Sequence, residues 1–204
     1  YLGKDKLLFD KYAQHHGINN KKIKLAYIGT LGYSYDLTLV FDAMRILPAD
    51  DLRNIEFYIM GDGPLERQLK DESKDLPVIF TGGLPYPKMV EVLSQCDIAM
   101  NPIKKKAAQS IINKHMDYAM AGLPVINTQE NEEYRKLLAQ YDAGINCECG
   151  NAKDCANAIH TLINDKDLRK RMGRNSRRLG EERFDRQETY KHIISIIEKL
   201  ANNN

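Results

Sequence analysis

The 204-residue sequence contains no tryptophan, little net charge and no long apolar run. Its 30 Lys and Arg residues nearly balance its 28 Asp and Glu residues, which removes the electrostatic argument for nucleic acid or an acidic membrane as the main partner. Its longest apolar runs, such as residues 25–31, fall far short of the ~20 residues of a membrane-spanning helix. Because 43% of the residues are hydrophobic and 28% are charged, the composition excludes a disordered chain and indicates a soluble globular protein.

Cysteine is also scarce, and the four thiols do not form a familiar framework. A chain of this size needs no disulfide staples, so we expect free thiols and a reducing, cytoplasmic compartment. Cys147, Cys149, Cys155 and His160 could be drawn as a four-ligand metal site. However, zinc motifs usually space paired cysteines by two to four residues, and Cys155 falls on the apolar face of a predicted helix. Free thiols are therefore the preferred interpretation, with Cys96 buried beside an apolar run.

What the sequence does contain is a repeated alternation of short apolar runs and helical patterns. The runs, each predicted to be a strand, are residues 24–28, 55–60, 78–81, 98–100, 124–127 and 144–147. Apolar residues at helical spacing predict helices over 36–47, 64–73, 87–95, 113–121, 132–139, 155–163, from 165 onward, and 190–200. Short, unalternating strands separated by helices predict an α/β fold with a Rossmann-like open parallel sheet of about six strands and helices on both faces.

The loops at the carboxyl ends of these strands are the candidate binding elements, because open parallel sheets bind ligands there. Residues 29–34 place backbone amides before a helix, which suits an anion, although a tight turn that needs glycine explains them equally well. Residues 61–64 are better explained as a turn and helix start. Residues 82–84 are explained equally well by a close backbone approach to a ligand and by a plain loop. Residues 104–106 are three lysines in a solvated loop or in a loop that closes over a phosphate. His115 is more often a structural histidine than a catalyst.

Five stretches, in order, resemble the C-terminal, donor-binding half of GT-B glycosyltransferases of the large retaining family 4. They are residues 27–32 (YIGTLG), 57–64 (FYIMGDGP), 78–82 (VIFTG), 96–102 (CDIAMNP) and 113–126 (NKHMDYAMAGLPVI). Each is degenerate alone, but their order and spacing are specific, and the resemblance extends from about residue 22 to the C-terminus. It divides the chain into a linker or helical segment (1–20), a nucleotide-sugar-binding domain (21–182) and a helix that crosses back to an N-terminal domain (183–204). The first residue, Tyr1, is then expected to follow a cut between the two halves.

The resemblance also assigns site residues. The family carries two glutamates eight residues apart, and here Asp117 and Gln109 occupy these positions. It implies that Asp117 binds the ribose, that Gln109, Ser110 and Ile111 contact the donor sugar, and that Gly83 and Leu84 contact the base. An amide at Gln109 can donate to and accept from sugar hydroxyls, but it cannot supply the charge of a glutamate.

The diphosphate site departs most from the family pattern. The family's Arg and Lys in the first loop correspond to Thr30 and, approximately, Asp36, so neither cation is present. The charge that develops on a diphosphate leaving group must still be stabilised. We expect this charge to be stabilised by the backbone amides of Gly32, Tyr33 and Ser34, by the Ser34 hydroxyl and by the Lys114 ammonium. The lysines at residues 104–106 are the alternative cations.

The resemblance implies that the full-length enzyme transfers a sugar from a UDP- or GDP-sugar to a glycan or lipid-linked acceptor with retention, in bacterial surface polysaccharide or glycoconjugate synthesis. It implies no cofactor and no metal. The expected partners are the donor and the N-terminal acceptor domain, without which this half is inactive, and not nucleic acid. A basic segment (residues 169–178) is expected to be a solvated helix face or, as the alternative, a contact with the inner face of the membrane. Two other functions stay open: a nucleotide-sugar 2-epimerase, and a degenerate, non-catalytic nucleotide-binding module.

Overall fold

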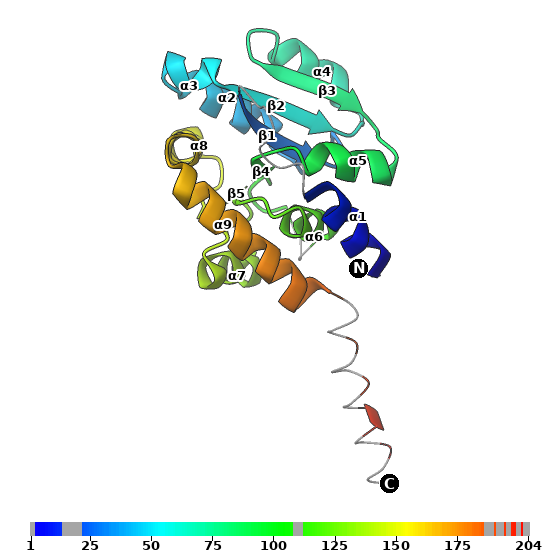
Figure 1. Cartoon of the computed structure of the whole chain (residues 1–204). Coiled ribbons are helices and arrows are strands. Elements are labelled where there is room, and N and C mark those ends of the chain that lie inside the picture. Colours follow the sequence, from blue (N-terminus) through cyan, green and yellow to red (C-terminus); the bar gives the residue numbers. More distant parts are fainter. Residues whose placement is uncertain are drawn as a thin grey trace.

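The computed structural model describes residues 3–13, 22–107 and 112–185, with single positions at 190, 194, 197, 198 and 201 (Figure 1). Its centre is a six-stranded sheet in the order β3-β2-β1-β4-β5-β6, and every pairing in it is parallel. The strands are β1 (Ile23–Ile28), β2 (Ile55–Met60), β3 (Val78–Gly82), β4 (Ile98–Asn101), β5 (Val125–Asn127) and β6 (Gly144–Asn146). The predicted α/β, Rossmann-like parallel sheet is confirmed.

Helices cover both faces of this sheet, as the unalternating strands require. They are α1 (Gly3–Ala13), α2 (Leu37–Ile46), α3 (Ala49–Arg53), α4 (Glu66–Glu72), α5 (Tyr86–Leu93), α6 (Asn113–Met120), α7 (Glu132–Tyr141), α8 (Ala152–Asn164) and α9 (Lys166–Leu179), followed by a π-helical turn (Gly180–Phe184). Side chains of β1 alternate between two cores: Leu25 and Tyr27 pack with α2, α4 and α8, whereas Ala26 and Ile28 pack with α1, α5, α6 and α7. Each core is therefore sealed by its own helical layer.

One helix was not expected from the sequence. Pro48 stops the pattern of α2, but it also begins the five-residue helix α3, because a proline near a helix start sacrifices no intrahelical hydrogen bond. Within residues 1–20, the described part is helix α1, whose Phe9 is buried in the same core as α5. The crossing helix predicted over 183–204 lies mostly outside the described residues, so the domain boundaries stay predictions. No helix in the described ranges combines the length and apolar character needed to cross a membrane.

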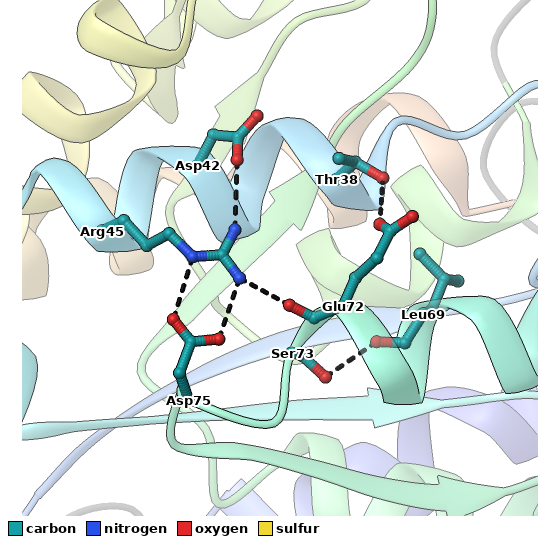
Figure 2. A network of polar contacts seen from close by, with 7 residues as sticks. All are labelled: Thr38, Asp42, Arg45, Leu69, Glu72, Ser73 and Asp75. Atoms are coloured by element: carbon teal, nitrogen blue, oxygen red, sulfur yellow. Dashed lines mark hydrogen bonds and ion pairs between the residues drawn. The ribbon is translucent and has the colours of Figure 1, made fainter.

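A surface network joins the C-terminal end of helix α4 to helix α2 (Figure 2). The Arg45 guanidinium donates to both carboxylate oxygens of Asp75, at 3.0 and 2.9 Å, and to the backbone carbonyl of Glu72. Thr38 donates to the Glu72 carboxylate at 2.9 Å. The bidentate geometry lowers the pKa of Asp75, chiefly through its hydrogen bonds with Arg45. The C-terminal end of α4 and the start of its connection to β3 are thereby held against α2.

Candidate functional site

The loops that follow β1 and β2 are joined backbone to backbone at the carboxyl edge of the sheet. The Gly29 amide donates to the carbonyl of Met60 at 3.0 Å, and the Leu31 amide donates to that of Asp62 at 2.7 Å. Gly61 has φ +156°, and a Cβ there would lie 1.9 Å from the Gly29 carbonyl oxygen. Only glycine permits this approach. The amides of Gly29 and Leu31 are occupied by these bonds, so an anion would have to use other donors.

Beside these loops lies a cleft of about 550 Å³. It opens next to β1 and β4, where the strand order reverses, which is the usual ligand position in an open parallel sheet. The strand-end loops and the first turns of α6 line it: Ile28, Gly29, Thr30, Tyr35, Met60, Gly61, Asp62, Gly83, Leu84, Met89, Ile112, Asn113, Lys114 and Asp117. The cleft thus contains the predicted base, ribose and cation positions Gly83, Leu84, Asp117 and Lys114 together.

Lys114 is the most unusual group in this cleft. Its side chain is buried, with 8% of the residue exposed, and its Nζ atom has no hydrogen-bond partner among the described residues. The ammonium lies over two aromatic rings, 4.2 Å from the centroid of Tyr27 and 3.7 Å from that of Tyr35. Burial lowers the pKa of Lys114 to about 7 because the charged form loses its hydration. Two ring faces stabilise the cation only in part, so an incoming anion would find it unneutralised.

Asp117 lies one helical turn after Lys114, on the same side of α6. It is also 8% exposed, and its Oδ1 atom accepts a hydrogen bond from the Tyr86 hydroxyl at 3.1 Å. Across the cleft, Gly83 lies against the Asp62 carboxylate, since a Cβ at Gly83 would be 2.5 Å from Oδ2. A ligand with hydroxyl groups would therefore contact the buried Asp117 carboxylate on α6 and the backbone of Gly83, which has no side chain to cover it.

His115 faces away from the cleft although it is the neighbour of Lys114. Its ring stacks on Tyr134 with centroids 3.7 Å apart and planes 6° apart. The Ile112 backbone N–H donates to Nδ1 at 3.3 Å, and Nε2 lies 3.1 Å from the side-chain nitrogen of Asn101. Burial, and secondarily Lys114, lowers the pKa of His115 to about 3. The ring is neutral and structural, as preferred from the sequence, and it fastens the first turn of α6.

Two sets of supporting residues were missed in the sequence. Asn101, Asn127 and Asn146 end β4, β5 and β6, and their side chains form a ladder with hydrogen bonds of 2.7 and 2.9 Å. The recurrence of Asn at the ends of three predicted strands was the sequence signal that could have predicted this ladder. The Tyr118 hydroxyl bridges the strands beside the cleft, accepting from the Ile28 amide and donating to the Met100 carbonyl, both at 3.1 Å. No sequence pattern separates this tyrosine from an ordinary core residue.

Comparison with known proteins identifies the family of this chain. The sequence model of the family described as glycosyl transferases group 1 matches residues 9–179. The chain belongs to this family. The resemblance stated from the motifs, to GT-B glycosyltransferases of family 4 type, is confirmed.

Individual relatives are distant. The chain is 23% identical to the sulfoquinovosyl transferase SQD2 of Arabidopsis thaliana over 159 residues, which cover 77% of this chain and 30% of that protein. It is 24% identical to the uncharacterized glycosyltransferase MJ1069 of Methanocaldococcus jannaschii over 204 residues, covering 98% and 50%. The structure of Anabaena Alr3699/HepE in complex with UDP superposes with a TM-score of 0.75 at 17% identity, covering 95% of this chain and 53% of that one. The chain thus spans half or less of the curated relatives that it matches.

The other predicted site residues of this group 1 domain are not brought together in the cleft among the described residues. Gly32, Tyr33 and Ser34 do not line the cleft; Tyr33 is 71% exposed, and the Ser34 carbonyl accepts from the Lys104 amide at 3.0 Å. Gln109, Ser110 and Ile111 lie outside the described residues. Thr30 lines the cleft, and Asp36 does not. The donor-sugar and diphosphate assignments to these residues therefore stay predictions.

The thiols of this glycosyltransferase domain are free, and the histidine once grouped with them is engaged elsewhere. Cys96, Cys147 and Cys155 are buried, and burial raises the pKa of Cys96 and of Cys147 to about 12, so these thiols stay protonated. His160 contacts the Asp51 carboxylate through Nδ1. Within the described part of the chain, no group of three or more His, Cys, Asp or Glu side chains is placed to hold a metal ion.

Proposed function

We propose that the cleft binds the nucleotide-diphosphate part of a UDP- or GDP-sugar. The observation that carries the proposal is a buried, unneutralised ammonium at Lys114, one helical turn from the buried carboxylate of Asp117, in a cleft of about 550 Å³. In this arrangement Lys114 contacts the diphosphate, Asp117 accepts hydrogen bonds from the vicinal ribose hydroxyls, and Gly83 and Leu84 contact the base. Clefts of roughly 300–1,000 Å³ are the usual size for ligands of this kind.

The family and its structural neighbours support this donor class. The superposed Anabaena protein has UDP in one structure, UDP and glucose in another and UDP-glucose in a third. In the present chain, the Lys114 ammonium can supply the positive charge that a diphosphate leaving group needs. The ammonium neutralises charge as the sugar bond breaks, and the dry aromatic surroundings of Tyr27 and Tyr35 strengthen that interaction.

The proposal for the full-length enzyme is that it transfers the sugar to a glycan or lipid-linked acceptor with retention, in bacterial surface polysaccharide or glycoconjugate synthesis. An N-terminal domain supplies the acceptor site, so the present chain alone binds donor but is inactive. The diphosphate leaving group assists on the face from which it departs, with no protein nucleophile. The proposal involves no metal or cofactor, and Lys114 is the lining cation that faces the diphosphate. The enzyme acts in the cytoplasm, with peripheral association at the inner face of the membrane.

Calorimetric titration with UDP, GDP and UDP-glucose tests the donor assignment. We expect one nucleotide to bind, and Asp117→Asn to weaken its binding at least tenfold, because a charged hydrogen-bond acceptor contributes roughly 1.5–3 kcal/mol. Lys136→Gln is the matched control, because Lys136 is exposed on α7 and pairs with Glu132. Failure of every nucleotide to bind, in this chain and in the full-length protein, would refute the donor assignment and favour a degenerate, non-catalytic module.

The epimerase alternative requires a separate readout. A 2-epimerase needs acid and base groups around the sugar, whereas the titratable side chains among the described lining residues are Tyr35, Asp62, Lys114 and Asp117. Incubation of the full-length protein with the bound nucleotide sugar and analysis of the products separates the two reactions. Accumulation of the C2 epimer without transfer or hydrolysis would refute the transferase proposal.

A further inference from the structure

A second cavity, of about 520 Å³, lies at the edge of the sheet opposite the donor cleft. Its walls are the residues just before β4, the α6–β5 connection (residues 120–124) and helix α9. The amino ends of parallel strands meet at one edge and their carboxyl ends at the other, so this groove is separate from the cleft beside Lys114. Helix α6 spans the two, with its first turns in the cleft and its end in the groove. In Figure 1, α9 (orange) runs along the outside of the molecule beside α7 and α8.

The groove is basic because of α9, in which seven of 14 residues are Lys or Arg and one is Asp. Four of the seven cations have partners. Arg169 donates to the carbonyls that end α8, Arg171 pairs with Asp142 at 3.0 Å, and Arg178 lies 3.9 Å from Glu182. Arg177 pairs with Asp10 at 2.7 Å and Glu181 at 2.8 Å, and also donates to the Met120 carbonyl. These four cations are explained by the fold.

The other three cations are not. Lys166, Lys170 and Arg174 are exposed, line the groove, and have neither an ion pair nor a hydrogen bond with any described residue. They recur every four residues, so they form one row about 12 Å long on a single side of the helix. The carboxylate that lines the groove, Asp97, already accepts from the Lys24 backbone amide at 2.8 Å. A bond from a neutral amide leaves Asp97 charged, so three exposed, unpaired cations share this concave surface with one carboxylate, and the remaining positive charge favours an anion.

The backbone beneath this row is closely packed, which makes the groove a preformed site. A Cβ at Gly173 would lie 2.5 Å from the Gly122 carbonyl oxygen, so α9 touches the α6–β5 connection directly. Arg177 ties the same connection to α9 through the Met120 carbonyl. A guanidinium and two ammonium groups on a rigid helix suit the several oxygens of a phosphate.

We propose that the groove between α9 and residues 120–124 binds a phosphate or diphosphate group through Lys166, Lys170 and Arg174. The group belongs either to a soluble phosphorylated compound or to a phospholipid headgroup, and both offer the same chemistry to the row of cations. The site is separate from the donor cleft, so it does not depend on the proposed function.

Two probes and three variants test this site. The probes are inorganic pyrophosphate, titrated by calorimetry at low salt, and phosphatidylcholine vesicles with or without phosphatidylglycerol, assayed by co-sedimentation. The test variant is Lys166→Gln/Lys170→Gln/Arg174→Gln. The control variant, Lys136→Gln/Arg171→Gln/Arg178→Gln, removes the same charge from exposed positions outside the groove. Lys114→Ala separates pyrophosphate bound in the donor cleft from pyrophosphate bound in the groove.

We expect the test variant to bind its probe at least tenfold more weakly, with less than a twofold change in the control and no change in nucleotide affinity. Loss of pyrophosphate binding identifies a soluble phosphate compound, whereas loss of binding confined to phosphatidylglycerol vesicles identifies a headgroup. Binding of neither probe by the unmodified protein, or equal binding by the test variant, would overturn the proposal. The side chains substituted in the test and control variants are exposed, whereas Lys114 is buried, and a thermal melt of each variant verifies that it is folded.

Discussion

Replacement of Lys114 by methionine is expected to stabilise the protein and to weaken donor binding at the same time. Methionine has nearly the length of the lysine stem and carries no charge, so it fills the space beside Tyr27 and Tyr35 without burying an ammonium. In the ligand-free protein the buried charge is a cost, whereas in the complex it meets the diphosphate. Stability and binding should therefore change in opposite directions.

The size of the stability change follows from the pKa. A fall from the ordinary 10.5 to about 7 corresponds to roughly 5 kcal/mol against the folded, charged state, at 1.36 kcal/mol per pKa unit. The two ring contacts offset about 1–2 kcal/mol each. We therefore expect Lys114→Met to raise the free energy of unfolding by about 1–3 kcal/mol at pH 6. Urea denaturation of both proteins, with equal m-values, measures this difference.

The pH dependence has a definite sign. Between pH 7 and 10.5 the unfolded chain holds the Lys114 proton more tightly than the folded protein does, so the stability contribution of this group rises with pH. The advantage of the methionine variant should be largest below pH 7 and shrink as the pH rises toward 10.5. A variant that is less stable than the unmodified protein at pH 6 would refute the reasoning.

Donor binding tests the other half of the argument. Loss of a charge-assisted hydrogen bond of roughly 1.5–3 kcal/mol predicts nucleotide binding about 10- to 100-fold weaker in Lys114→Met. Above pH 7 the unmodified protein must take up a proton when it binds, so its affinity should fall as the pH rises, and the variant should lack this component. Calorimetry in two buffers of different ionisation enthalpy counts that proton. Equal nucleotide affinities of the two proteins would show that Lys114 does not contact the diphosphate.

Three further predictions concern the scaffold. Gly61→Ala should lower the free energy of unfolding by more than about 2 kcal/mol in urea denaturation, because the new Cβ would meet the Gly29 carbonyl. Gly150→Ala, at φ +78° with nothing within 4 Å, should lower it by about 1 kcal/mol. Equal losses would show that the close approach is unimportant. Tyr118→Phe should cost about 1–3 kcal/mol, because two buried backbone groups lose their partner, and a change below 0.5 kcal/mol would contradict this. A thiol reagent should modify Cys149 first in the folded protein, because the other three thiols are buried; early reaction of Cys96 would contradict the structure.

The sequence by itself determined the architecture and the edge of the sheet that carries the cleft. Short apolar runs predicted all six strands, and the change to helical spacing predicted most of the helices, because burial on both faces of a sheet leaves a local signal. Residues 29–34 and 82–84 were interpreted as a possible tight turn or close backbone approach, whereas residues 61–64 were interpreted as a turn and helix start, so the contact of Gly61 with Gly29 was not predicted.

Only the tertiary structure decided which side chains share the cleft and which do not. Lys114 and His115 are adjacent on α6, yet one faces Tyr27 and Tyr35 while the other stacks on Tyr134. Neighbours on a helix point about 100° apart, so their surroundings depend on the elements packed around the helix. The same holds for α9, whose basic residues look alike in the sequence. Their partners lie on α1, α7, α8 and the turn after α9, and the fold alone separates the paired cations from the row at 166, 170 and 174.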